Sequence, residues 1–302
     1  MNYKNLFLVL LTLSSFAVSA QSNLLNAKTP DQIGKKSEAQ LNSDNDKPLP
    51  YGYVDDRDVL FGRKVWEIID LDERVNFPLY YPIDENLGEN RKSLYSVLIQ
   101  GIRDGRITEV YDSSYFTTKK TLAEIESVLV KVDTTEGGID QMNSDYEGYK
   151  NGTYKIDEQF INVTELKAID VNGYRIVGYW YFDKRQGELK YRMLGICPII
   201  PDVYTMGSEE KDYVDLFWVF FPASRDVLHE NYAFNDRNSA TPISFDHLLN
   251  ARRFSAVIYQ EENVMGDRKI DEYMKENAQM QLLESERVKE KIRDFEQDMW
   301  SY

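Results

Sequence analysis

The chain has 302 residues, 42% apolar and 13% aromatic, which is enough to form one or two hydrophobic cores and excludes a wholly disordered protein. It carries 51 Asp and Glu against 36 Lys and Arg, a net charge of -15 that disfavours binding to nucleic acid or anionic lipid. A single cysteine, Cys197, excludes an internal disulfide and a cysteine-rich zinc site, and only two histidines are present. This composition favours a structural or binding protein over an enzyme.

Residues 1–20 have the features of a secretory signal peptide. Lys4 gives a basic start, residues 6–13 form an apolar run, and Val18-Ser19-Ala20 offers small residues for cleavage after Ala20. The run is shorter than the roughly 20 apolar residues that a membrane span needs. Gln21 stands where a diacylated lipoprotein would need cysteine, so we expect an exported chain without a lipid of its own. The alternative is an apolar N-terminal helix that stays in the fold.

Residues 21–48 are rich in Asn, Ser, Lys, Asp and Gln and show neither helical nor strand periodicity. We expect a flexible polar arm here. It either acts as a plain tether or becomes ordered on a partner.

Residues 49–135 are predicted to form an N-terminal α+β part. A first helix is expected near residues 55–69, because three aspartates favour a helix start and apolar residues follow along one side: Asp55, Asp56 and Asp58, then Leu60, Val65, Trp66 and Ile69. A second helix is expected over 93–103, a strand over 107–111, and a third helix from the capping box that Thr121 and Glu124 form.

Residues 153–266 are predicted to form a C-terminal, β-rich α+β part, after a polar, glycine-containing stretch at 133–152. Apolar and polar residues alternate around a turn at 183–187, which predicts a hairpin of 174–182 with 188–195. The apolar run 214–221 predicts a central strand ended by Pro222. A helix over 244–252 and a strand over 254–259 follow.

The helix and strand at 93–111 resemble those at 244–259, which is either a duplicated α+β unit or a chance likeness between amphipathic helices. Residues 267–302 contain no proline and no glycine, and they predict one long charged helix of about 48 Å at 1.5 Å per residue. This helix either reaches a neighbour or folds back on its own chain. The expected fold class is therefore α+β, with mixed helices, an antiparallel sheet and a long C-terminal helix.

Catalytic and ligand-binding motifs are missing from the sequence. No Gly-x-Ser-x-Gly elbow or phosphate-binding glycine loop occurs, and His229-Glu230 and Asp246-His247 do not match the His-Glu-x-x-His zinc pattern. We therefore expect no catalytic residue, no metal site and no cofactor. The 21 tyrosines fit either an aromatic sheet core or a surface for a protein or a glycan.

The segment from Arg63 to Pro82, which reads RKVWEIIDLDERVNFPLYYP, resembles the characteristic stretch of the GldN and PorN family of gliding motility proteins. The signal peptide, polar arm, 174–200 hairpin, 216–222 strand, 245–256 segment and charged terminal helix also follow that family's order. The resemblance covers nearly the whole mature chain.

This resemblance implies a periplasmic component of the type IX protein secretion system at the inner face of the outer membrane. Family members form rings with copies of themselves and with an outer-membrane lipoprotein called GldK or PorK, and contact with the GldL–GldM motor complex is expected. The family has no catalytic motif, so the resemblance implies no catalytic residues.

We expect subunit contacts from the aromatic 77–82 segment and the terminal helix, since both carry more apolar surface than a monomer needs. The interface residues predicted on this basis are Trp66, Phe77, Tyr80, Tyr81, Ile292 and Phe295. Two other functions stay open. A glycan- or peptidoglycan-binding module would show exposed Tyr and Trp along a groove, and a periplasmic hydrolase would join His229 or His247 to carboxylates in a pocket.

Overall fold

The computed structural model describes residues 46–84, 92–144, 146–151, 156–205, 212–235, 243–275 and 277–300. The expected signal peptide and all but the last three residues of the expected polar arm lie outside this part of the chain. The structure is of mixed α and β type, with antiparallel sheets and a long C-terminal helix, as predicted.

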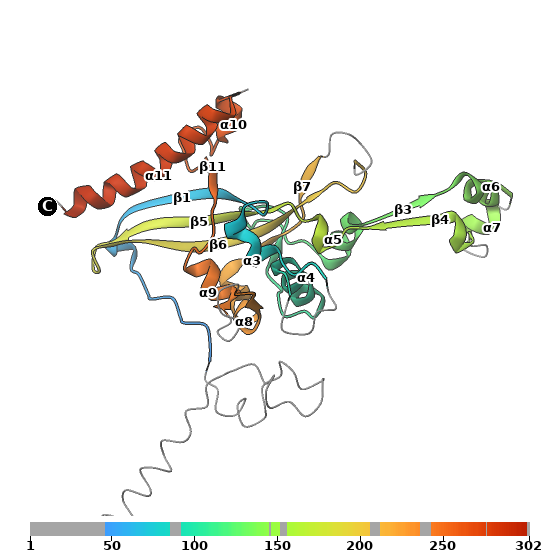
Figure 1. The fold of residues 1–302 in the computed structure, drawn as a ribbon, viewed down its shortest axis with the longest axis horizontal. Coiled ribbons are helices and arrows are strands. Elements are labelled where there is room, and N and C mark those ends of the chain that lie inside the picture. Colours follow the sequence, from blue (N-terminus) through green and yellow to red (C-terminus); the bar gives the residue numbers. More distant parts are fainter. Residues whose placement is uncertain are drawn as a thin grey trace, which may run out of the picture.

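A seven-stranded antiparallel sheet forms the centre of the molecule (Figure 1). Its strands run in the order β11-β1-β5-β6-β8-β2, and β7 pairs with β6 outside this path. Strands from both predicted parts share the sheet, because β1 pairs with β5 on one side and with β11 on the other. The strands are β1 (Val59–Asp70), β2 (Val110–Tyr111), β5 (Gly173–Asp183), β6 (Glu188–Pro201), β7 (Tyr213–Asp215), β8 (Trp218–Phe220) and β11 (Val257–Glu261).

The predicted hairpin is confirmed in β5 and β6. Gly187 adopts a positive φ of 67°, which glycine accepts without steric cost, and its N–H donates to the Asp183 carbonyl at 2.7 Å. The pairing then runs from Asp183↔Glu188 to Gly173↔Ile199, with a bulge between Val177 and Gly178. This long pairing provides the surface on which both cores are built.

The predicted helix near residues 55–69 is wrong, because that segment forms a short 3-10 turn at Asp56–Asp58 and then strand β1. Val65 and Trp66 are neighbours on β1 and point to opposite faces, yet both are 0% exposed. A central strand that is buried on both faces has a nearly continuous apolar run, which periodicity alone does not separate from a helix.

Helices cover one face of the sheet and enclose the main core. They are α3 (Phe77–Tyr80), α4 (Leu94–Arg103), α5 (Leu122–Leu129), α8 (Phe221–Glu230) and α9 (Phe245–Asn250). The predicted cap of α5 is confirmed, because Thr121 and Glu124 each accept a hydrogen bond from the other's backbone N–H. Leu98 of α4, Phe221 of α8 and Phe245 of α9 pack with sheet residues such as Ile176 in this core. The predicted single strand over 214–221 is wrong, because this run is divided into β7 and β8 and already enters α8 at Phe221, with Pro222 in the first turn of that helix.

The opposite face of the sheet has a smaller cluster made of Trp66, Val177, Cys197 and Trp218. The loop after β2 covers part of it through Phe116, whose ring lies 5.3 Å from that of Phe220. Gly195 lies beneath this ring, and an added Cβ would come within 2.6 Å of it. The packing of Phe116 therefore requires glycine at position 195, because any side chain there would clash with the ring.

The C-terminal helix is predicted to be continuous over residues 267–302, but the structure divides it in two. Helix α10 spans Ile270–Tyr273 and α11 spans Ala278–Trp300, while Met274 leaves helical geometry at φ -116° and ψ 68°. The Met274 carbonyl accepts a hydrogen bond from the Gln281 side chain at 2.8 Å, which satisfies it outside a helix. The 23 residues of α11 span about 35 Å, shorter than the 48 Å expected.

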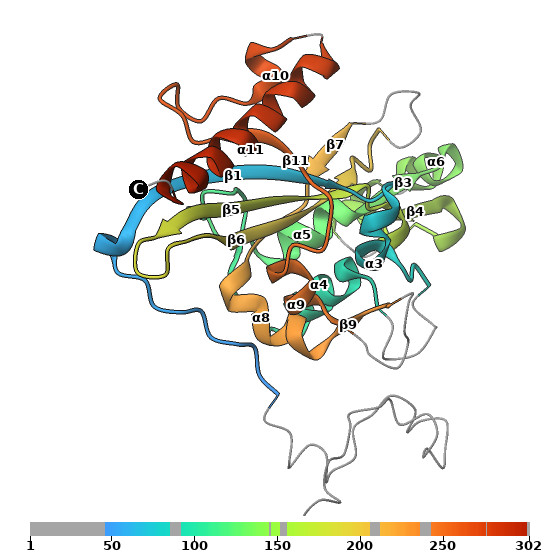
Figure 2. The same cartoon turned by 60° about the vertical axis from the view of Figure 1, so that its left-hand side comes forward.

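One side of α11 packs against its own chain, beside β11 and β1 and away from α8 and α9 (Figure 2). Val288 and Ile292 pack with Val65 and Ile258, and the Phe295 ring stacks on Phe61 at 4.5 Å. The Ser285 hydroxyl oxygen also accepts a buried hydrogen bond from the Ile258 N–H at 3.0 Å. This helix therefore completes the body of the protein at a sheet edge.

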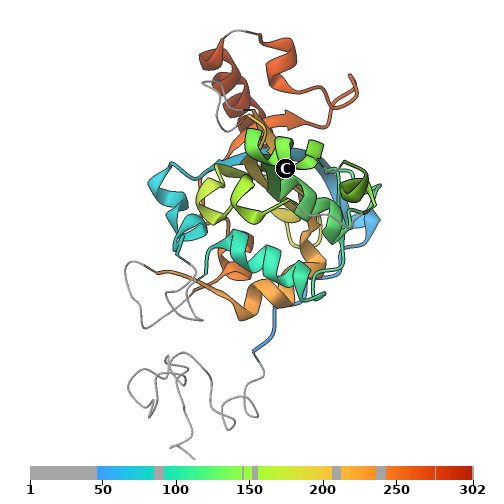
Figure 3. The same cartoon turned by 90° about the vertical axis from the view of Figure 1, so that its right-hand side faces the viewer.

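A two-stranded ribbon stands off from this body in Figure 1 and points toward the viewer in Figure 3. Its strands are β3 (Val130–Thr134) and β4 (Ile161–Glu165), and its tip holds α6 (Glu136–Ser144) and α7 (Tyr146–Lys150). The polar stretch at 133–152 is thus an ordered part of this ribbon in the residues that the structure describes. A second small ribbon pairs β9 (Tyr232–Ala233) with β10 (Ile243–Ser244).

The two segments proposed as a duplication both fold as a helix followed by a strand. Helix α4 leads to β2, and α9 leads to β11. The two strands lie at opposite ends of the sheet order. Duplication stays a prediction, since chance likeness between two such units fits the same arrangement.

A buried ion pair connects β1 to the turn after α9. The Glu67 carboxylate accepts a hydrogen bond from the Arg252 guanidinium at 2.9 Å, with side chains 2% and 24% exposed. Burial disfavours the charge of Arg252, but the facing Glu67 carboxylate outweighs this and raises the pKa of Arg252. The guanidinium also lies over the Tyr191 ring at 4.1 Å, so three elements meet here.

We expect Arg252→Ala to lower the free energy of unfolding by about 3–5 kcal/mol, because it leaves the Glu67 carboxylate buried without its cation. Urea denaturation measures this change. The matched control is Arg63→Ala, which removes the more exposed Arg63–Glu261 pair and should cost about 1 kcal/mol or less. Equal losses in the two variants would contradict the role assigned to burial.

A second prediction concerns the attachment of α11. Ile292→Ala removes a side chain that is 5% exposed and should cost about 2–5 kcal/mol, with faster amide hydrogen exchange along α11. Leu283→Ala on the same helix removes a side chain that is 62% exposed and should change stability by less than about 0.5 kcal/mol. If both variants behave alike, the helix is not held by its packed side.

Candidate interaction surfaces and a polar pocket

An aromatic cluster lies on the surface at the short helix α3. The Phe77 and Tyr81 rings meet edge to face at 5.5 Å, and Tyr80 meets Tyr81 at 4.8 Å. Phe77 is 37% exposed and Tyr81 is 41% exposed, whereas Leu79 between them is fully buried in the main core. Leu79 therefore fixes a helix that leaves two large rings facing solvent.

A buried asparagine holds the start of this cluster in place. The Asn76 amide donates to the Asp70 and Ser255 carbonyls at 2.6 and 3.0 Å, and its oxygen accepts from the Ser255 N–H at 2.8 Å. The Tyr80 hydroxyl donates to the Ile169 carbonyl at 3.0 Å. Partial burial raises the pKa of Tyr80, so its hydroxyl stays protonated near neutral pH. The cluster is a rigid surface feature.

The structure separates the six predicted interface residues. Phe77 and Tyr81 are exposed and Tyr80 is half-buried beside them. Trp66 is 0% exposed in the cluster with Cys197, and Ile292 is 5% exposed on the side of α11 that packs against Val65 and Ile258. Phe295 lies between the rings of Phe61 and Phe182. Trp66 and Ile292 therefore stabilise the chain's own packing, because side chains so deeply buried have almost no surface for a partner.

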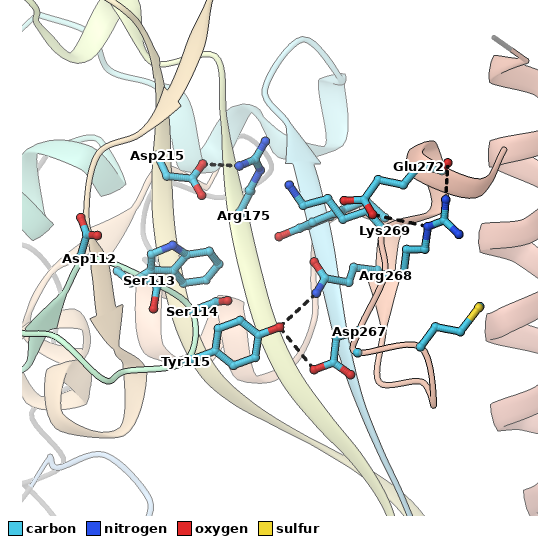
Figure 4. Close-up of a pocket in the computed structure, with 15 residues that line it drawn as sticks. Asp112, Ser113, Ser114, Tyr115, Arg175, Asp215, Asp267, Arg268, Lys269 and Glu272 are labelled. Atoms are coloured by element: carbon cyan, nitrogen blue, oxygen red, sulfur yellow. Dashed lines mark hydrogen bonds and ion pairs between the residues drawn. The ribbon is translucent and has the colours of Figure 1, made fainter. Parts of the chain in front are cut away.

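A polar pocket of about 460 Å³ opens over the face of the sheet that Trp66 and Trp218 share (Figure 4). Arg175 of β5 and Asp215 of β7 point toward one another, and their ion pair measures 2.5 Å. On the other side, the Tyr115 hydroxyl donates to Asp267 at 3.3 Å. The loops 112–115 and 265–269 form the walls, and Tyr259 and Gln260 of β11 also line it.

The acidic side chains of this pocket already have donors within the chain. Asp215 pairs with Arg175, Glu272 with Arg268 at 3.6 Å, and Asp112 with Lys120 at 3.2 Å. Asp267 accepts from Tyr115 and from a backbone N–H. In the described part of the chain the Lys269 ammonium has no such partner, and the Arg175 Nε is buried without one. Among the charged groups of the pocket, those with spare hydrogen-bonding capacity are therefore cationic.

The shifted pKa values at this site favour an ion pair over a deprotonated nucleophile. Burial disfavours the Arg175 charge, but the Asp215 carboxylate outweighs it and raises the Arg175 pKa. Burial also raises the pKa of Tyr259 and of the Cys197 thiol, which keeps both groups protonated. Cys197 lies fully buried in the cluster with Trp66 and Trp218, so it is not a reactive thiol.

Neither histidine lines this pocket. His229 lies near the surface with its Nε2 3.0 Å from an Asp46 carboxylate oxygen, and His247 lies on α9. No group of three metal-ligating side chains gathers within the described residues. The pocket therefore offers charges and hydrogen-bonding groups, and neither histidine is among them.

The apolar face of the ribbon is the feature that sequence reasoning missed. Val132 of β3 and Val163 of β4 lie directly opposite each other and are 59% and 61% exposed. The signal was present, because valine alternates with charged residues over 130–133 and apolar residues alternate with polar ones over 161–164. The two runs lie about 30 residues apart, beyond the range of a simple hairpin pattern.

Comparison with known proteins places the chain in a family. No curated protein matches it. Within the described ranges, no helix has the length and apolarity needed to cross a bilayer. The sequence does match the family described as gliding motility associated protein GldN over residues 54–301, which is most of its length and includes the sheet, the ribbon and α11. The chain therefore belongs to the GldN family.

Proposed function

We propose that this chain is a non-enzymatic structural subunit of the type IX protein secretion and gliding motility machinery. It forms a ring in the periplasm with copies of itself and with an outer-membrane lipoprotein of the GldK or PorK kind, and this ring meets the GldL–GldM motor complex. The observation that carries the proposal is the family match over residues 54–301. That family is a motility and secretion component and not a known class of enzyme.

Features of the sequence support the proposed location. The expected signal peptide at 1–20 directs export, and Gln21 at the expected new N-terminus leaves attachment to the outer membrane to a lipidated partner. The net charge of -15 favours a partner with a basic surface, because opposite charges speed encounter and disfavour wrong partners.

The aromatic cluster supports a role in assembly. Phe77 and Tyr81 expose large rings on a helix that Leu79 and Asn76 hold in place. Rigid aromatic side chains lose little conformational entropy on binding and often dominate the energy of protein interfaces. We therefore keep Phe77, Tyr80 and Tyr81 as the proposed subunit contact from this segment.

The two alternative functions find less support. A glycan-binding groove would expose several ring faces, but in the pocket Trp218 is 2% exposed and Tyr259 is mostly buried, which leaves Tyr115 at 49%. A hydrolase would use a histidine beside carboxylates, and the pocket holds neither His229 nor His247. We retain both as alternatives without a specific observation in their favour.

The test is co-purification of the GldK-like lipoprotein with this chain from the periplasm and outer membrane. We expect the double variant Phe77→Ser and Tyr81→Ser to retain at least tenfold less lipoprotein than the wild type, because it removes apolar area from the contact. Thermal unfolding followed by circular dichroism should show a small change, since both rings are partly exposed in the monomer.

Tyr53→Ser is the matched control, because this ring is 84% exposed and lies outside the cluster. It should leave lipoprotein recovery unchanged. Wild-type levels of lipoprotein with the double variant would remove this segment from the interface. Failure of the wild type itself to retain the lipoprotein would overturn the proposed function.

A further inference from the structure

We propose that the ribbon, residues 130–165, is a second element, besides the aromatic cluster, that docks this chain onto its lipoprotein partner, through an apolar face with acidic residues around it. The inference rests on the proposed function and deepens it, since it names the surface used and the chemistry of the surface that receives it. That surface is apolar with a basic rim.

The ribbon has two chemically different faces. The pairing register places Val130 opposite Glu165, Val132 opposite Val163 and Thr134 opposite Ile161 on one face. The intervening pairs, Lys131 with Thr164 and Asp133 with Asn162, belong to the other face. One face is therefore mainly apolar and the other is polar, the pattern of a sheet with one covered side.

No element of the described chain covers the middle of the apolar face. Val132 and Val163 are 59% and 61% exposed, although they form a direct cross-strand pair. Both views show the ribbon extending away from the sheet and the helices (Figures 1 and 2). An isolated two-stranded ribbon is at best marginally stable in water, so an apolar face of this kind fits a surface that a partner completes.

The root and the tip of the ribbon are both built for order. At the root, Leu129 and Leu166 are each 3% exposed in the main core, and the Leu166 N–H donates to the Leu129 carbonyl at 2.9 Å. At the tip, the Thr135 N–H donates to the Phe160 carbonyl at 2.9 Å, and the Phe160 ring packs where Gly137 has no side chain. The ribbon therefore presents its face in a defined direction.

Charge decides between a second copy of this chain and a different protein as the occupant. Residues 130–165 contain eight Asp and Glu against three Lys, a net charge of -5. They therefore hold one third of the chain's net charge of -15 in 36 of its 302 residues. The ribbon of another copy is equally acidic and would be repelled by this one, whereas a partner with a basic rim would be attracted.

The tip enlarges the proposed contact. Ile139 on α6 is 43% exposed, and Tyr146 and Tyr149 on α7 are 57% and 43% exposed. These side chains add aromatic and aliphatic area at the far end of the acidic ribbon. A contact that uses the apolar face and the tip together would join many weak apolar contacts into one surface.

The experiment measures binding of the full mature chain to the purified GldK-like lipoprotein in detergent at several salt concentrations. In a first variant an Asn-Gly turn replaces residues 130–165 and joins Leu129 to Leu166, where the backbone is already closed. In a second, Val132→Thr and Val163→Thr keep β-branched side chains but add hydroxyls to the apolar face. Asn162→Thr, on the polar face, is the matched control.

We expect the turn replacement to abolish binding and the double threonine variant to weaken it at least tenfold, while Asn162→Thr stays within twofold of the wild type. Wild-type affinity should fall as salt rises, and Glu136→Gln with Asp140→Asn should flatten that dependence. Hydrogen exchange in the complex should show protection of Val132 and Val163.

Two results would overturn the inference while leaving the proposed function in place. One is wild-type affinity in the double threonine variant. The other is protection of the ribbon by a second copy of this chain in the absence of the lipoprotein. If the wild type does not bind the lipoprotein at all, the proposed function fails and the docking role fails with it.

Discussion

The fold depends on the position of β1 in the middle of the sheet. Its backbone pairs with β5 over eleven register pairs from Val59↔Asp183 to Asp70↔Gly173, and with β11 on the other side. These pairings bring residues far apart in the chain into one sheet, and they bury both faces of β1, so each face needs its own cover. The helices cover one face with the main core, and the Phe116 loop and the cluster around Trp66 cover part of the other.

Local signals in the sequence are enough for the elements that local interactions stabilise. Helix α4, the capped helix α5, helix α9 and the β5–β6 hairpin are all predictable from periodicity, caps and turn residues. Strand β1 is not, because burial on two sides removes the alternation that identifies a strand. Helix α8 is missed as well, since Pro222 marks the end of a strand and the first turn of a helix equally well.

The candidate surfaces were only partly predictable for the same reason. Aromatic content pointed to the 77–82 segment, and the structure exposes Phe77 and Tyr81 there. Sequence composition cannot separate these two residues from Trp66 or Ile292, whose exposure is decided by strands and helices distant in sequence. The ribbon was hidden because its two strands are separated by a polar tip. The GldN family relationship over residues 54–301 gives these surfaces a common context, that of a gliding motility associated protein.

Because its root is closed, the ribbon can change in length independently of the rest of the fold. Leu129 and Leu166 are joined by a backbone hydrogen bond in the core, so the chain leaves the core and returns to it at the same place. Adding one residue to each strand would move the tip outward by about 3.3 Å without displacing a core side chain, though it would also turn the tip to the opposite face. The distance from the core to the ribbon tip can therefore change by two residues per strand, about 7 Å at a time, while the root of the ribbon stays in place.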